Sequence, residues 1–187
     1  YLNIKGNKSI DFANKELDFW QKKYNATPVQ TSYLSMMASN HATLFEYTGN
    51  IKELYKSEDL LTQSNLSNAY SKVGTIRSLA RNYISQHRFK ESLALANKAI
   101  AIGEGKKETQ KLLFDVQMEL GNYPEALKNL EAIRDMNDFD YLIRLAKWND
   151  HLGDINTAIT FMEKAKDIAE RENNKVLKIW SYSNLGD

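Results

Sequence analysis

The chain contains no cysteine, and this absence excludes several kinds of site at once. Without a thiol there is no disulfide framework, no thiolate zinc site and no cysteine nucleophile. The absence does not identify a compartment, because cytoplasmic proteins and proteins of the bacterial cell envelope or periplasm can both lack cysteine. We therefore expect either location and do not choose between them.

Proline, glycine, long apolar runs and an excess of one charge are also scarce. Two prolines and eight glycines among 187 residues exclude collagen-like and Pro-rich classes and suit a helical protein with short connections. No stretch approaches the roughly 18 apolar residues of a membrane-spanning helix. With 25 basic and 24 acidic residues the formal charge is +1, so the sequence indicates neither nucleic acid nor an anionic membrane as partner.

Motifs that carry catalysis or hold a cofactor are missing as well. The sequence has no dinucleotide-binding G-x-G-x-x-G, no P-loop, no nucleophile elbow and no H-E-x-x-H. His41, His87 and His151 are not at the spacing of metal ligands on one helix, and Gly103-Glu104-Gly105-Lys106 follows no strand. We predict no enzyme activity, no cofactor and no metal.

What the sequence does contain is a repeat. A Leu–small or Leu–aromatic pair is followed by a bulky residue and then by a small residue, three times over. The successive sets lie 34 and 32 residues apart: Leu79-Ala80, Phe89 and Ser92; Leu113-Phe114, Tyr123 and Ala126; Leu145-Ala146, Ile155 and Ala158. A fixed period of this length is typical of a solenoid of stacked units rather than of one closed core.

Each unit reads as two helices joined by a tight turn. Small and apolar residues recur three or four apart, as in Ala126, Leu130 and Ile133, which marks one face of a helix. Gly121-Asn122 and Gly153-Asp154 supply a glycine that can leave a helix through positive φ and a polar residue that can cap the next one.

The repeat resembles the tetratricopeptide repeat, a helix–turn–helix unit of about 34 residues. The family's small residue of the second helix corresponds to Ser92, Ala126 and Ala158, and its Leu–small pair of the first helix to Leu79-Ala80, Leu145-Ala146 and Leu185-Gly186. Its aromatic residue is matched by Tyr83 but not by Gln117 or Asn149, and Glu104, Asp138 and Glu170 replace its proline. The resemblance implies an all-α fold, a right-handed α-solenoid of antiparallel helix pairs.

We expect one repeat array over residues 1–187. It comprises a leading helix at about 9–25, repeats at about 29–64, 66–104, 106–137 and 138–172, and an unpaired final helix at about 175–187. The first residue is Tyr1, and a repeat opens near the end, so we expect a fragment of a longer repeat protein; richness in Lys and Asn suggests a bacterial one. The uncapped terminal helices offer a route to self-association.

In the family, the first helices of successive repeats line a concave face that binds peptides, and the resemblance implies the same face here. The expected ligand contacts on that face are Arg77, Arg81, Ile84, Lys111, Met118, Ile143, Lys147 and His151. Arg77 and Arg81 lie one helical turn apart, so their guanidinium groups can hold a carboxylate or phosphate. The alternative is that Arg81 pairs with Asp115 or Glu108 of the next repeat and has no functional role.

Two functions remain open from the sequence. One is a protein-interaction scaffold that binds an unknown peptide or partner protein through the concave face. The other is a sensory or regulatory repeat module of a larger protein whose effector domain lies outside these residues.

Overall fold

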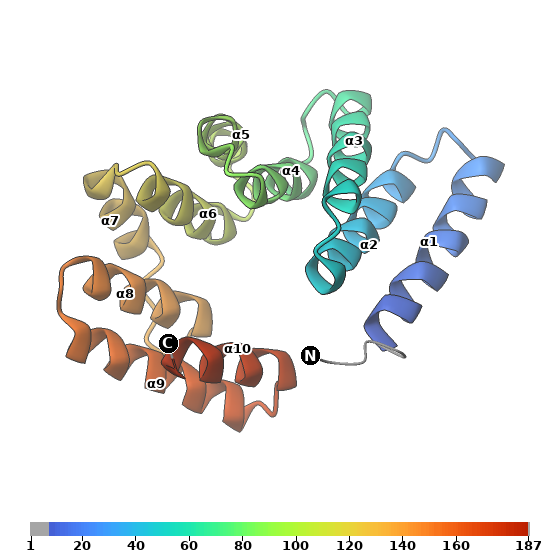
Figure 1. Cartoon of the computed structure of the whole chain (residues 1–187). Helices are drawn as coiled ribbons and strands as arrows, with labels where there is room; N and C mark the ends of the chain where they lie inside the picture. Colours follow the sequence, from blue (N-terminus) through green and yellow to red (C-terminus); the bar gives the residue numbers. More distant parts are fainter. Residues whose placement is uncertain (1–7, 187) are drawn as a thin grey trace. The chain divides into compact units, whose positions relative to one another are not determined.

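The computed structural model describes residues 8–186, and in that range it contains ten α-helices and no strand. The all-α class expected from the sequence is therefore confirmed. The chain divides into two compact units, residues 1–104 and 105–187 (Figure 1).

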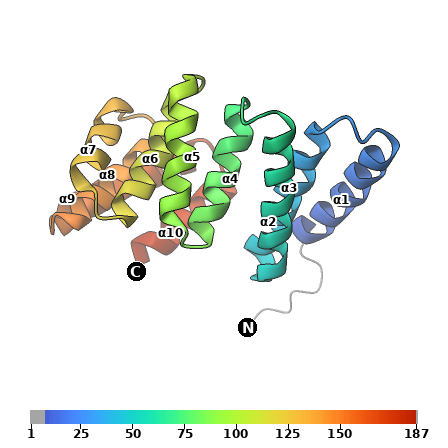
Figure 2. The ribbon, with the colours of Figure 1, turned by 90° about the horizontal axis from the view of Figure 1, so that it is seen from above.

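The first unit is built from five helices in which neighbours along the chain pack against each other. Its helices are α1 (Lys8–Ala26), α2 (Ser32–Thr48), α3 (Ile51–Ser67), α4 (Val73–Ser85) and α5 (Phe89–Ile102). The antiparallel pairs α2–α3 and α4–α5 are joined by short turns, α4 packs on α3, and α1 packs on α2 (Figure 2).

The second unit repeats this plan. Its helices are α6 (Lys106–Glu119), α7 (Tyr123–Ala132), α8 (Phe139–His151), α9 (Ile155–Arg171) and α10 (Lys175–Gly186). The pairs α6–α7 and α8–α9 are antiparallel, α8 contacts both α6 and α7, and α10 packs against α9. The helix-pair period seen in the sequence is thus the building unit of the structure.

The turns inside the pairs depend on a left-handed residue at a fixed position. Gly121 and Gly153 adopt φ of 73° and 80°, which costs a residue without a Cβ nothing. The corresponding position in the α4–α5 turn is His87, whose φ of 57° is unusual for a side chain of this size. The side chain of Asp154 then caps α9 by accepting the Thr157 backbone N–H, in line with the turn chemistry expected from the sequence.

The small residues of each second helix form the buried seam of the array. Ser92, Ala96 and Ala99 of α5 are fully buried, and Ala126 and Leu130 of α7 are buried equally completely. Because helix spacing is set by the side chains at the contact, these small residues allow a close approach of neighbouring helices. In the second unit, Ala126 and Leu130 form a cluster whose other buried members are Phe114, Ile133 and Tyr141.

The final helix differs from the sequence expectation in its register. Leu185-Gly186 was expected to be the Leu–small pair, but Gly186 is exposed. Ser181, which lies 35 residues after Ala146, is fully buried instead and occupies the small position. The assignment of Leu185-Gly186 as the Leu–small pair is therefore wrong. The pair fits the motif in sequence, but the residue of α10 that is buried against α9 is Ser181, one repeat length after Ala146.

Two buried amides join α3 to α4 in the first unit. Asn65 is fully buried, donates to the backbone oxygens of Leu61 and Thr75, and accepts the Thr75 hydroxyl. Asn82 donates to the backbone oxygen of Leu54 at 3.0 Å. A buried amide needs all its partners, so these bonds favour one relative placement of the two helices.

Candidate functional site

A groove of about 960 Å³ lies between α8, α9 and α10 in the second unit. Its apolar lining comes from all three helices: Ile143, Ala146, Ile155, Ala158, Ile159, Met162, Trp180 and Leu185. Its polar lining consists of Asp115, Arg144, Lys147, Asp150 and Asn184. An apolar floor with a few polar groups at its edge is the usual composition of a protein's ligand sites. We call this the α8–α10 groove.

The basic side chains beside this groove are already neutralised by carboxylates of the neighbouring first helix. Arg144 of α8 approaches Asp115 of α6 at 2.6 Å, and Lys147 approaches Glu119 of α6 at 2.8 Å. Both pairs run from α8 to α6, so they fix the spacing of the two first helices as well as cancelling charge. A ligand with a large net charge of either sign therefore gains little from these side chains.

Lys111 belongs to the same set of pairs but lies deeper. Its side chain is 7% exposed, and its ammonium group lies 2.8 Å from Asp140, 3.2 Å from Glu108 and 3.5 Å from Asp138. Burial alone lowers the pKa of Lys111, but the hydrogen bond to Asp140 and the nearby carboxylates outweigh it and raise the pKa. Lys111 thus remains charged and engaged within the unit.

Asp138 connects these charges to the start of α8. Its carboxylate accepts the backbone N–H of Tyr141 at 3.2 Å as the helix cap and lies 2.7 Å from the ammonium group of Lys107. Burial raises the pKa of Asp138, but the hydrogen bonds from Lys107 and from the Tyr141 backbone, with the charge of Lys111, hold it below its ordinary value.

The lowered pKa of Asp138 predicts a loss of stability in acid. A carboxyl group whose pKa is lower in the folded state stabilises the fold above its unfolded pKa, and this contribution disappears as the pH falls through the folded pKa. We expect the unfolding free energy to fall below about pH 4, with a smaller decrease in Asp138→Asn, which keeps a capping side chain but has no charge to lose. Urea titrations of both proteins at several pH values measure the two slopes. Equal slopes would show that Asp138 does not contribute to the acid sensitivity.

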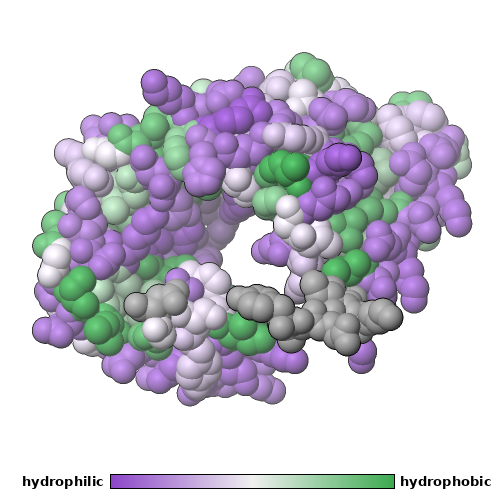
Figure 3. Space-filling model, in the orientation of Figure 1, coloured by the Kyte–Doolittle hydropathy of each residue, from purple (hydrophilic) through white to green (hydrophobic). Residues whose placement is uncertain are grey.

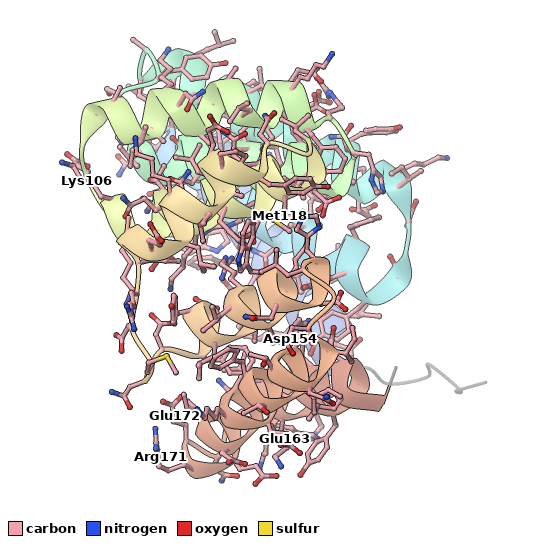
Figure 4. The ribbon with its side chains drawn as sticks, turned by 90° about the vertical axis from the view of Figure 1, so that its left-hand side faces the viewer. Lys106, Met118, Asp154, Glu163, Arg171 and Glu172 are labelled. Atoms are coloured by element: carbon pink, nitrogen blue, oxygen red, sulfur yellow. The ribbon has the colours of Figure 1, made fainter. Side chains whose placement is uncertain are left out.

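The structure places the other predicted ligand contacts of the second unit at different sites. Ile143 lines the α8–α10 groove together with Lys147. Met118, by contrast, lies near the end of α6 and packs against the core cluster of Phe114, while Asp154 marks the start of α9 (Figure 4). His151 is exposed at the end of α8, where its ring stacks on that of Tyr123 with centroids 3.9 Å apart.

The first unit has a smaller groove of about 410 Å³ between α2, α3 and α4. Most of its lining side chains are small: Ser35, Ala38, Ser39, Ala42, Thr43, Ser57, Ser78 and Ser85. The predicted residue Arg81 lines this groove, whereas Arg77 and Ile84 of the same helix are half-buried. Three ligand contacts were predicted in this unit, and Arg81 is the one that the lining of this groove includes.

Sequence reasoning missed the part of the α8–α10 groove that comes from α9 and α10. Ile159 and Met162 follow the helical spacing of a core stripe, and nothing in the sequence distinguishes a core stripe from a groove floor. Trp180, which was not assigned to a surface, lies 40% exposed at the groove, with its ring edge-on to that of Phe139 at 5.9 Å. The partial exposure of Trp180 identifies it as a groove residue, but this exposure depends on how α10 packs and cannot be read from the sequence.

The described residues contain neither a candidate metal site nor a candidate membrane span. Between residues 8 and 186, no group of three or more His, Cys, Asp or Glu side chains is placed to hold a metal ion. Over the same residues, every helix is too short or too polar to cross a bilayer.

Comparison with known proteins finds likeness in structure only. No protein-family model and no curated protein sequence matches the chain. Among solved structures, a chain of the APC/C hetero-tetramer Cut9–Hcn1 matches with a TM-score of 0.73 at 14% identity over 84% of this chain, which spans only 29% of the length of that chain. MamA matches with a TM-score of 0.63 at 14% identity, over 92% of this chain and 98% of its own.

A third match is YrrB, described as a TPR protein with an unusual peptide-binding site. Its TM-score is 0.58 at 15% identity, covering 96% of this chain and 95% of its own. At such low identities the likeness establishes the helix-pair fold that these structures share.

Proposed function

We propose that this chain, which has the tetratricopeptide-repeat fold, is a protein-interaction scaffold that binds a peptide or partner protein in the α8–α10 groove. The observation that carries the proposal is an accessible apolar floor beside charges that are already paired. Burying apolar surface is worth about 25 cal/mol per Å², so an apolar side chain entering the groove supplies the binding energy.

The proposed ligand is an extended or helical segment with apolar side chains spaced to reach Ile143, Ile159 and Trp180. An aromatic or aliphatic anchor in a concave site usually carries most of the affinity of an interface. The paired charges of Arg144 and Lys147 would then act at the rim, where they exclude wrong partners more than they add affinity. The peptide-binding site named for YrrB supports this class of ligand by analogy of fold.

In the first unit, Arg81 stays our proposed contact for a carboxylate of a bound peptide or protein. It lines the groove between α2 and α4, where small hydroxyl side chains leave room for a polypeptide backbone. This contact is secondary to the apolar groove, because a solvent-exposed ion pair is worth about 0–1 kcal/mol.

The test is peptide selection followed by a matched substitution. The immobilised chain is used to select from a random peptide library, and the selected peptides are measured against the parent, Ile159→Lys and Leu152→Lys. Both residues are exposed apolar side chains of the second unit, but only Ile159 lines the groove. We expect apolar peptides whose affinity falls at least about tenfold in Ile159→Lys and is unchanged in Leu152→Lys.

Two results would overturn the proposal. One is the failure of the library to yield any peptide that binds the parent. The other is equal binding by Ile159→Lys and the parent, with unchanged melting curves showing that both are folded.

A further inference from the structure

The charged side chains that line the α8–α10 groove do not balance one another. Four lining residues carry charge: Asp115, Arg144, Lys147 and Asp150. Arg144 pairs with Asp115 at 2.6 Å, and Lys147 pairs with Glu119 at 2.8 Å. Asp150 remains, and between residues 8 and 186 no basic side chain forms an ion pair with its carboxylate. The groove and its paired neighbours therefore hold two cations and three carboxylates, an excess of one negative charge.

The two basic residues nearest to Asp150 in the sequence are engaged elsewhere. Lys147 lies one helical turn before it, but the Lys147 ammonium group contacts Glu119 of α6. His151 is the next residue, and its ring stacks on that of Tyr123 with centroids 3.9 Å apart. Consecutive residues of a helix do not face each other, so His151 does not neutralise Asp150. Asp150 is thus an exposed carboxylate in a groove whose other charges are paired.

The position of Asp150 in α8 is unfavourable for the free protein. It lies in the last turn of α8, which ends at His151, and the C-terminus of a helix disfavours a carboxylate and favours a cation. Asp150 is also not needed to cap the next helix, because Asp154 does so by accepting the backbone N–H of Thr157 at 3.2 Å. A charge placed against a local rule is expected at functional sites. A cationic side chain bound here would offset both the excess charge and the dipole of the helix end.

α10 adds a second hydrogen-bond acceptor to the groove lining. The amide nitrogen of Asn184 donates to the backbone oxygen of Trp180 at 2.8 Å, whereas its amide oxygen accepts no hydrogen bond within the described residues. The groove thus offers a ligand an amide oxygen from Asn184 as well as the carboxylate of Asp150. Both groups require donors, and Lys and Arg are the side chains that combine several donors with a positive charge and no acceptor.

The apolar floor and Asp150 lie within reach of one short segment. Ile143 and Asp150 are seven residues apart on α8, which is about 10.5 Å along the helix at about 1.5 Å per residue. An extended chain covers this distance in about three residues, and a helix needs about seven. On the face drawn in Figure 3, hydrophobic side chains form separate patches in a largely hydrophilic surface. A ligand that matches an apolar patch on this protein must therefore also match the polar groups beside it.

We propose that the segment bound in the α8–α10 groove carries a Lys or Arg at a fixed distance from its apolar anchor, and that Asp150 selects this basic side chain. The distance is about three residues in an extended segment and about seven in a helical one. This inference rests on the proposed function, since it assigns the chemistry of the partner of that same groove. The apolar floor supplies affinity and Asp150 supplies discrimination, because a neutral residue at that place leaves the carboxylate unpaired and an acidic one is repelled.

The test uses peptides selected on the immobilised parent from a random library. A basic residue should be enriched among them at one fixed spacing from an apolar residue. The tightest peptide and its version with that basic residue replaced by Gln are then titrated against the parent and Asp150→Asn by fluorescence anisotropy. The replacement should weaken binding to the parent by about fivefold, whereas Asp150→Asn should bind both peptides with the same, weaker affinity.

Two further variants serve as control and as charge reversal. Glu163→Gln removes the same charge from an exposed side chain of α9 that does not line the groove, so it should keep the full difference between the two peptides. Asp150→Lys should prefer a version of the peptide with Glu in place of the basic residue. Asp150→Asn should melt no earlier than the parent, because a carboxylate is removed from a helix C-terminus.

The outcomes separate this inference from the proposed function. Apolar peptides without a basic residue at a fixed spacing, or an Asp150→Asn variant that keeps the full preference for the basic peptide, would overturn the role of Asp150 and leave peptide binding in the groove intact. A library that yields no binder, or equal binding by Ile159→Lys and the parent, would overturn the proposed function and this inference with it.

Discussion

Replacing Ala126 by glutamate is expected to destabilise the second unit by roughly 3–5 kcal/mol, enough to unfold much of it near room temperature. The side chain of Ala126 is fully buried where α7 meets its neighbours, surrounded by Phe114, Leu130 and Tyr141. A carboxylate placed there meets the apolar groups of this cluster. It must either lose its charge or force the helices apart, and both cost free energy.

The matched control is Ala132→Glu in the same helix. Ala132 is exposed at the end of α7, so the same substitution there should cost less than about 1 kcal/mol, mostly through an unfavourable charge at a helix C-terminus. Urea unfolding followed by circular dichroism measures both variants against the parent. If Ala126→Glu and Ala132→Glu had similar midpoints, the repeat register on which the fold rests would be wrong.

The buried seam that contains Ala126 could be predicted from the sequence, because its small residues recur at the same position in successive repeats. Ser92, Ala126 and Ala158 were identified as equivalent from spacing alone, and the structure gives each of them 9% exposure or less. A small residue repeated at the same place in each unit has one physical explanation, the close contact of neighbouring helices. Predictions of this kind depend on contacts that every repeat makes in the same way.

The charges of the candidate site were less predictable for a physical reason. Lys111 and Lys147 were expected to contact a ligand, yet both pair with carboxylates of the second unit. Pairing between successive first helices was considered for Arg81 with Asp115 or Glu108, but not for Arg144, which lies 2.6 Å from Asp115. Which cation pairs with which carboxylate depends on how far two neighbouring helices are shifted along each other. The repeat period in the sequence does not reveal that shift.

The α8–α10 groove depends on the same kind of information. Ala158 in this groove is 9% exposed and its neighbour Ile159 46%, whereas Ala126, the equivalent of Ala158 in the preceding repeat, is fully buried. The difference comes from the way α10 covers α9, which it does mainly through Leu177 and Ser181. The placement of one helix thus decides whether a core stripe becomes a binding surface.

Replacing Ser181 by glutamate should therefore detach α10 from α9. Ser181 is fully buried, and its hydroxyl donates to the backbone oxygen of Leu177 at 2.7 Å. A carboxylate cannot donate to this oxygen, so a glutamate would lose the hydrogen bond that the serine makes. The cost is local, because α10 can leave α9 while α8 and α9 stay paired. We expect amide exchange in residues 175–186 to accelerate by about 100-fold or more, and trypsin to cleave after Lys175 or Lys178.

Ser183→Glu is the matched control, because Ser183 lies two residues further along the same helix and is exposed. It should leave both the exchange of α10 and its resistance to trypsin close to those of the parent. Rapid exchange in Ser183→Glu together with a protected α10 in Ser181→Glu would mean that the helix presents its other face to α9. In that case the groove would have a different floor, and Ile159 would no longer be the residue to substitute in the peptide-binding experiment.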